Sequence, residues 1–79
     1  MHIKILGSGC AKCHSLEEKV RKIVEQNSID AVITKVTDIQ DIMKYGIMMT
    51  PGIVINEKVI SSGTVPKDEQ ILKWLKEAE

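Results

Sequence analysis

Residues 7–13 have the sequence GSGCAKC, in which a glycine-containing turn runs directly into two cysteines, Cys10 and Cys13. Before this turn, apolar and polar side chains alternate over residues 2–6, which predicts a short strand. After it, apolar residues recur at helical spacing, which predicts an amphipathic helix from residue 11 to about residue 26. The two cysteines are therefore predicted to lie where a strand has ended and the first helix begins.

The first predicted helix has an apolar stripe and an opposite face that is predicted to be exposed to solvent. On the exposed face we expect two ion pairs at i,i+4 spacing, Glu17 with Arg21 and Glu18 with Lys22. The apolar stripe is predicted to face the core and consists of Leu16, Val20, Ile23 and Val24.

The next segment predicts a strand and a short helix. β-Branched residues are frequent over residues 31–36, and this run has the length of a strand rather than that of a helix. Thr37 and Gln40 have the spacing of a capping box, so we expect the short helix to begin there. Gly46 is predicted to end it.

Two apolar runs, 52–55 and 59–61, flank the connection 56–58 and predict a β-hairpin. Pro66, followed by acidic residues, indicates the start of a C-terminal helix. The element order is βαβαββα, in which the first two strands are parallel and the hairpin strands are antiparallel. We therefore predict an α/β fold, a four-stranded mixed sheet flanked by three helices, formed by a single domain over residues 1–79.

The charge balance of the chain limits its expected partners. Eleven basic residues balance eleven acidic ones, so the formal net charge is zero. Because the chain lacks the positive field that attracts nucleic acids or anionic lipids, neither is an expected partner. The apolar runs are far shorter than the roughly 20 residues of a membrane-spanning helix. The first residues also lack the pattern of a secretory signal, which predicts the cytoplasm.

Cys10 and Cys13 have the spacing of a C-x-x-C motif. A disulfide bond across so short a loop would add little stability to the fold. A chemical role therefore explains the two cysteines better than a structural one. Unpaired N–H groups and the helix dipole favour the thiolate at a helix N-terminus, and Lys12 adds local positive potential. We therefore predict that Cys10 attacks a disulfide of a partner and that Cys13 resolves the resulting mixed disulfide.

A competing hypothesis is a binding or carrier module that holds Cu(I), Zn(II) or a metalloid through the same two thiolates. A closed zinc site requires four ligands. Of the remaining soft candidates, His2 is predicted to lie at the opposite edge of the sheet, and His14 to point about 100° away from Cys13 on the helix. The cysteine loop is similar to that of small copper-chaperone domains, but those domains have the element order βαββαβ. A third hypothesis is a regulatory or structural module whose cysteines are vestigial.

Three segments in order resemble the thioredoxin-like superfamily, and more narrowly its short archaeal and bacterial redox-active disulfide proteins. They are the strand leading into Cys10 and Cys13, the sequence YGIMMTPGIVIN over 45–56, and SGTVP over 62–66. The resemblance covers nearly the whole chain. It implies a thioredoxin-like fold and the activity of a thioredoxin- or glutaredoxin-like thiol-disulfide oxidoreductase. It also implies that the C-x-x-C dithiol is the only redox group, with no further cofactor.

The resemblance also implies substrate-binding residues and partners. It implies a cis peptide bond between Thr50 and Pro51, with the Thr50 backbone pairing with an extended substrate segment. Met49 and Gly63 are the other implied substrate contacts. Of Met48 and Met49, we expect one to be exposed as part of an adaptable apolar rim, with core packing as the alternative. The implied partners are disulfide-containing proteins and a flavin-dependent thioredoxin-type reductase, and the implied state is a monomer.

Overall fold

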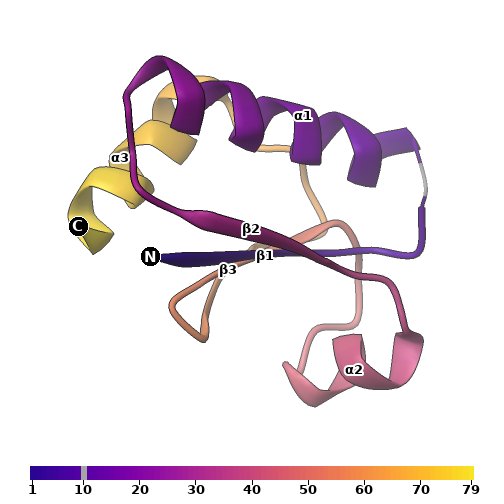
Figure 1. Ribbon diagram of the computed structural model, residues 1–79. Helices are drawn as coiled ribbons and strands as arrows, with labels where there is room; N and C mark the ends of the chain where they lie inside the picture. The colour runs from indigo at the N-terminus through magenta and orange to yellow at the C-terminus, as the bar shows by residue number, and fades with distance from the viewer. Residues whose placement is uncertain (10) are drawn as a thin grey trace.

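A computed structural model describes residues 1–9 and 11–79, and Cys10 lies outside the described residues. The element order is the predicted βαβαββα (Figure 1). The elements are β1 (His2–Leu6), α1 (Ala11–Gln26), β2 (Val32–Val36), α2 (Ile39–Lys44), β3 (Gly52–Ile55), β4 (Lys58–Ser62) and α3 (Asp68–Ala78). Within the described part of the chain, no helix has the length and apolar character needed to cross a membrane.

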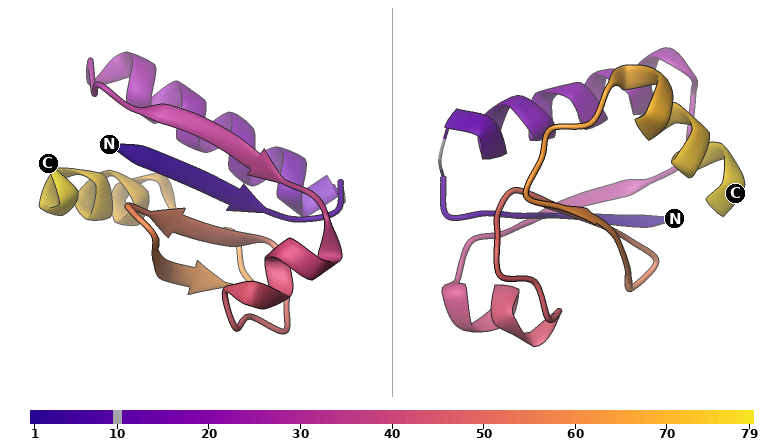
Figure 2. Two further views of the ribbon diagram at one scale, coloured as in Figure 1. Left: turned by 60° about the horizontal axis from the view of Figure 1, so that its bottom comes forward. Right: turned by 180° about the vertical axis from the view of Figure 1, so that it is seen from behind.

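The four strands form one mixed sheet in the order β2-β1-β3-β4. β1 runs parallel to β2 and antiparallel to β3, and β3 runs antiparallel to β4, as the arrows in the left view of Figure 2 show. The parallel pair is joined through α1, because a parallel connection needs a long crossover, whereas the antiparallel pair needs only a short turn. The predicted fold class, a four-stranded mixed sheet flanked by three helices, is confirmed.

The helices cover the two faces of the sheet unequally. α1 and α3 lie together on one face, and the short α2 lies on the other (Figures 1 and 2). The face under α1 and α3 holds the larger apolar core, which consists of Ile3, Ile5, Leu16, Val20, Ile23, Ile29, Ile53, Ile55, Ile71 and Leu75. A second, smaller cluster is formed by Leu6, Ile42 and Val54. Neighbouring strand residues point to opposite faces, which is why β1 and β3 contribute to both clusters.

The start of α2 differs from the prediction. The N-cap is Asp38, whose Oδ1 accepts a hydrogen bond from the Gln40 N–H at 2.8 Å. Asp38 directly precedes the first helical residue, so its short carboxylate reaches the second amide of the helix, and Thr37 is not the cap. The helix ends at Lys44, just before the predicted stop at Gly46, which has a φ of +77° and donates its N–H to the Met43 carbonyl.

The β3–β4 hairpin is tighter than the predicted connection 56–58. Its turn consists of Asn56 and Glu57, both with positive φ, and Lys58 already belongs to β4. Two residues with positive φ give a turn whose twist matches that of the flanking strands. The Asn56 side chain accepts a hydrogen bond from the His2 N–H, and the Asn56 N–H donates to the His2 carbonyl, so the turn is tied to the start of β1.

Candidate functional site

The loops that carry the predicted site residues leave the sheet at one end. In the β1–β3 register, Leu6 lies opposite Gly52. The chain after Leu6 leads to the cysteines, and the chain before Gly52 carries Thr50 and Pro51. Because the two strands are antiparallel, the end of β1 and the start of β3 lie at the same end of the sheet. The register therefore places residues 7–9, which follow β1, and the Thr50–Pro51 segment, which precedes β3, at one end of the sheet.

Cys13 lies in the first turn of α1 and is 5% exposed. Its sulfur lies against Gly7, where an added Cβ would overlap the Cys13 Sγ. Gly7 is therefore required by the close approach of the Cys13 side chain, a role that its position in a turn did not reveal. The predicted nucleophile, Cys10, lies outside the described residues.

Lys12 is exposed in the first turn of α1, where it was predicted to add positive potential. That turn contains no acidic residue that would oppose the positive end of the helix dipole. A thiolate is favoured at such a terminus by the dipole and by nearby cations.

The predicted substrate-binding residues gather around a cis peptide bond between Thr50 and Pro51. Pro51 is buried, and its carbonyl accepts a hydrogen bond from the Gly63 N–H at 2.8 Å. Gly63 has a φ of +80°, and the Met49 side chain packs against it, so that a Cβ on Gly63 would lie 3.2 Å from the Met49 Cβ. The structure therefore brings Met49, Pro51 and Gly63 together, with Thr50 exposed beside them.

Both methionines before this bond are exposed, whereas only one was expected to be. Met48 is 99% exposed and Met49 65%. Neither side chain is needed to fill the small cluster of Leu6, Ile42 and Val54 beneath α2. Thr50 and Met48 line a surface hollow of about 370 Å³ together with Ser8, Ile39, Ile42, Met43 and Ile47. The result is an apolar rim beside the exposed Thr50.

Glu17 was predicted to lie on the exposed face of α1, but it is only 9% exposed. Its Oε2 lies 3.0 Å from the Arg21 Nε, as the helical spacing predicted, and its Oε1 lies 3.4 Å from the Lys35 Nζ of β2. The hydrogen bond from Arg21 holds the pKa of Glu17 below its ordinary value, with Lys35 acting in the same direction and burial acting against both. Helical spacing alone could not reveal the cation from β2 that makes this burial possible.

Glu17, Lys35 and Cys13 line a cavity of about 190 Å³. The other lining residues are Ile5, Gly7, Gly9 and His14. Glu17 lies four residues after Cys13, so the two side chains project from the same face of α1 one turn apart. This spacing was the one signal in the sequence that could have linked Glu17 to the cysteines.

The two histidines lie apart from each other. The His14 Nε2 is 3.1 Å from Glu18 on the exposed face of α1, and the His2 Nε2 is 2.9 Å from the Thr34 Oγ1 at the far end of β1. Among residues 1–9 and 11–79, no three His, Cys, Asp or Glu side chains are grouped so as to hold a metal ion.

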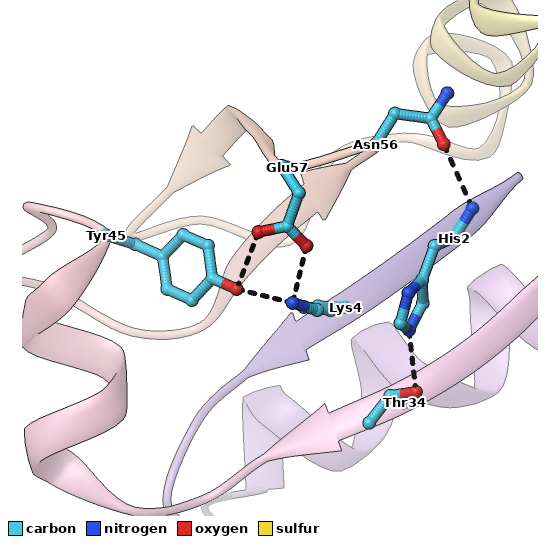
Figure 3. A network of polar contacts seen from close by, with 6 residues as sticks. All are labelled: His2, Lys4, Thr34, Tyr45, Asn56 and Glu57. Carbon is cyan, nitrogen blue, oxygen red and sulfur yellow. Dashed lines mark hydrogen bonds and ion pairs between the residues drawn. The ribbon is translucent and has the colours of Figure 1, made fainter.

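A second polar cluster lies on the α2 side of the sheet (Figure 3). The Lys4 Nζ donates to the Tyr45 hydroxyl at 2.7 Å and to the Glu57 carboxylate, and the Tyr45 hydroxyl donates to Glu57 at 3.4 Å. The hydrogen bond to Glu57 raises the pKa of Lys4, and the same bond lowers the pKa of Glu57. Lys4 alternates with Ile3 and Ile5 along β1, so this cluster lies on the face opposite the Cys13 cavity.

Comparisons with known proteins support a thioredoxin relationship. Residues 1–76 match the family model described as "Thioredoxin domain". The chain is 40% identical over 74 residues to a protein named thioredoxin from Methanocaldococcus jannaschii, covering 94% of this chain and 85% of that protein. It is 35% identical over 75 residues to a protein named thioredoxin from Methanothermobacter thermautotrophicus, covering 95% of this chain and 97% of that protein. The chain belongs to the thioredoxin domain family.

Proposed function

We propose that this protein is a thiol-disulfide oxidoreductase that transfers electrons through Cys10 and Cys13. Membership of the thioredoxin domain family and two relatives named thioredoxin support a redox function of this type. The observation that carries the proposal is the register of Leu6 with Gly52, since it brings residues 7–9, which precede the C-x-x-C in the sequence, to the same end of the sheet as the Thr50–Pro51 cis bond.

In the first step, the thiolate of Cys10 attacks one sulfur of a disulfide in a partner protein. Cys10 directly precedes Ala11, the first residue of α1, so the proposal assigns it the positive end of the helix. The dipole, the absence of an acidic residue among Ala11–His14 and the Lys12 charge favour its thiolate. A mixed disulfide forms, and the partner's other sulfur leaves as a thiolate that takes a proton from water.

In the second step, Cys13 attacks the Cys10 sulfur of the mixed disulfide. A bond forms between Cys10 and Cys13 as the bond to the partner breaks, so the partner leaves with its disulfide reduced to two thiols. The two electrons come from the dithiol of this chain. Cys13 suits the resolving role because its buried sulfur, held against Gly7, is less open to a bulky partner than an exposed thiol would be.

The segment around the cis bond is the proposed binding site for the partner. An extended strand can pair with exposed backbone through main-chain hydrogen bonds, and in this proposal the Thr50 backbone provides them. Met49 on Gly63 and the exposed Met48 form an apolar rim, and unbranched methionines adapt to differently shaped partners.

We further propose that the dithiol is the only redox group and that a flavin-dependent reductase of the thioredoxin type returns it to the reduced state. The proposed substrates are disulfide-containing proteins. A monomer acting in the cytoplasm would be consistent with a redox carrier that docks in turn with a reductase and with substrates.

The test is an insulin-reduction assay with dithiothreitol as electron source. Wild-type protein is expected to accelerate precipitation of the insulin B chain, and Cys10→Ser to abolish this acceleration. Cys13→Ser is expected to accumulate a mixed disulfide with insulin, detectable on a non-reducing gel. Turnover by Cys10→Ser at the wild-type rate would refute the proposal. Stoichiometric Cu(I) uptake by the reduced protein, without reductase activity, would favour the metal-carrier hypothesis instead.

A further inference from the structure

The outer edge of β2 is a feature of the sheet that the proposed exchange does not use. In the strand order β2-β1-β3-β4, β2 is the outermost strand on its side, as the left view of Figure 2 shows. Within residues 1–9 and 11–79, β1 is the only strand that pairs with β2. An unpaired strand edge presents backbone N–H and C=O groups that can pair with another extended segment.

The backbone groups of β2 alternate between its inner and outer sides. The Val32 N–H donates to the Met1 carbonyl, and the Val36 carbonyl accepts a hydrogen bond from the loop that follows β1. The backbone groups of these two residues therefore point inward, toward β1. In an extended strand the N–H and C=O of one residue point to the same side, and successive residues alternate. The N–H and C=O groups of Ile33 and Lys35 therefore point outward.

The opposite edge of the sheet, β4, is less suited to accept a further strand. Its register with β3 is shifted between Ile53 and Val54, and such an irregularity twists an edge away from pairing. In contrast, β2 keeps an unbroken register with β1 over all its 5 residues. Lys35 does not guard this edge, because its Nζ lies 3.4 Å from the Glu17 carboxylate under α1. The more regular of the two edges is thus the open one of β2.

A hollow of about 680 Å³ lies beside this edge on the α2 side of the sheet. It is lined by residues 34–38 along β2 and the chain after it, and by Lys4, Asp41, Lys44, Tyr45 and Glu57. Figure 3 shows three of these side chains together, with Thr34 on the neighbouring β2. Every second side chain of a segment added to β2 would lie on this face, because side chains alternate along a strand. The hollow therefore offers room for a long side chain of such a segment.

The charges around the hollow are not balanced. Lys4 is paired with Glu57, and the Lys44 Nζ lies 3.4 Å from the Asp41 carboxylate. Asp38 caps α2 and forms no ion pair within the described part of the chain. The remaining lysine of the lining is the one whose ammonium group is directed under α1. One carboxylate on this face is left without a cation, so a basic side chain complements the hollow best.

We propose that the outer edge of β2 is a docking site for an extended segment of a partner protein, which adds a strand to the sheet and places a lysine or arginine side chain in the hollow beside Asp38. The N–H and C=O groups of Ile33 and Lys35 provide the main-chain hydrogen bonds of this site. In strand addition, such bonds give affinity, and hollows for alternate side chains give specificity. The Asp38 carboxylate gives the preference for a cation.

A second copy of this chain fits the edge less well than a basic partner segment. If β2 paired with β2 of another copy, the side chains offered to the hollow would come from Val32, Thr34 and Val36, which share its face. None of the three carries a charge, so the Asp38 carboxylate would stay unmatched. The occupant that the charges favour is therefore a different polypeptide.

A segment docked on β2 would lead to the end of the sheet that carries the proposed binding site. Leu6 lies opposite Val36 in the parallel register and opposite Gly52 in the antiparallel one. The end of β2 and the Thr50–Pro51 segment therefore lie at the same end of the sheet. Docking on the edge of β2 requires no cysteine, so this inference and the proposed function are tested separately.

The test is an NMR titration of the ¹⁵N-labelled full-length protein with a short capped peptide that alternates threonine and valine around one central arginine. In the free protein we expect the outward amides of Ile33 and Lys35 to exchange with solvent faster than that of Thr34. The peptide is expected to shift the signals of the two outward amides until saturation. It should slow their exchange by about tenfold at a concentration of about ten times its Kd.

Two changes test the preference for a cation. Replacement of the arginine in the peptide by glutamate is expected to weaken binding by at least about fivefold, and Asp38→Asn to weaken binding of the arginine peptide by about twofold to fivefold, since solvated ion pairs are weak. Asparagine is as good an N-cap as aspartate, so α2 is expected to persist. Glu18→Gln is the matched control, because it removes an exposed carboxylate from α1 and should leave binding unchanged.

Absence of saturable shifts at Ile33 and Lys35 with the arginine peptide would overturn this inference, and so would equal binding of the arginine and glutamate peptides. Without peptide, protection of these amides that rises with protein concentration would show that a second copy occupies the edge instead. Insulin reduction by a protein that does not bind the peptide would refute the docking site alone. Peptide binding by a protein that does not reduce insulin would refute the proposed function alone.

Discussion

Two carboxylate–lysine pairs lie on opposite faces of the same sheet, and their surroundings differ. Glu17 and Lys35 meet beneath α1, where the carboxylate is nearly buried and borders the Cys13 cavity. Lys4 and Glu57 meet on the α2 side, where the Glu57 side chain is 64% exposed. Water screens the second pair strongly and the first pair less, so similar chemistry has unequal effects. We therefore expect the buried pair to contribute more to stability than the exposed pair, although both are ion pairs.

The apolar clusters on the two faces also differ, and the larger one lies on the face that holds Glu17 and Lys35. α1 and α3 together close one face over a core of ten buried residues, whereas the six-residue α2 covers only part of the other face. Most of the stabilisation from apolar burial is therefore expected on the α1 and α3 side. Substitutions on each face measure this difference.

The largest effect is expected from Ile53→Ala. Ile53 is fully buried in the central strand β3 and belongs to the larger core, so the change removes apolar contacts and leaves a cavity. We expect a loss of about 3–4 kcal/mol in the free energy of unfolding. Urea denaturation followed by circular dichroism measures it, with Val59→Ala on the exposed part of β4 as the control. A loss below that of the control would contradict the assignment of the main core to this face.

A smaller effect is expected from Ile42→Ala on α2. Ile42 is buried, but among residues 1–9 and 11–79 its cluster has only Leu6 and Val54 as other buried members. The surrounding side chains can close over the gap more easily than in the larger core, so we expect a loss of about 2 kcal/mol. The same urea titration measures it. If this loss equalled or exceeded that of Ile53→Ala, the two faces would be energetically alike.

Glu17→Gln tests the buried pair. The pKa of Glu17 is lowered in the folded protein, so its charge stabilises the fold above the ordinary value near 4.5, and this stabilisation disappears as the pH falls through the lowered value. We expect Gln to cost about 1 kcal/mol at neutral pH and progressively less in acid. Thermal unfolding over a pH series measures the stability difference between the variant and the wild type. For the control Glu18→Gln, this difference should change less with pH. A destabilisation that increased as the pH fell would contradict this expectation.

The smallest effect is expected from Glu57→Gln in the exposed pair. The pKa of Lys4 is raised and that of Glu57 is lowered, so both groups are charged across the neutral range and the pair is lost only in strong acid or strong base. Because both groups are solvated, we expect a smaller destabilisation than for Glu17→Gln, and one that disappears at high salt. Thermal unfolding at low and high salt decides it. A salt-independent cost as large as that of Glu17→Gln would show that exposure does not weaken this pair.

Most of the fold could be predicted from the sequence because its signals are local. Strand alternation, the stripe of α1 and the hairpin are patterns within ten to twenty residues, and each element was found within one or two residues of its predicted bounds. The errors occurred where two local signals compete or where distant residues meet. Thr37 and Asp38 are adjacent cap residues, and only the structure shows that Asp38 accepts the bond.

The candidate site was predictable to the extent that its residues lie in sequence motifs. The segments around Cys13 and Pro51 were recognised from their motifs, and the cis Thr50–Pro51 bond agrees with what the resemblance implied. The cavity was not predicted, because it requires Lys35 from β2 to meet Glu17 of α1 across the sheet edge. Helical spacing placed Glu17 beside Arg21 but gave no information about β2. Long-range contacts of this kind have no signature in a single sequence.

Gly7 limits how this protein can be redesigned. Its backbone lies outside the left-handed region, so the requirement for glycine arises from lack of space beside the Cys13 sulfur. Gly9 and Gly46 show the converse, since an added Cβ there meets open space and only their positive φ favours glycine. Ser8, between Gly7 and Gly9, is exposed, so it does not meet the same lack of space. A side chain at position 7 would instead require the Cys13 side chain to move.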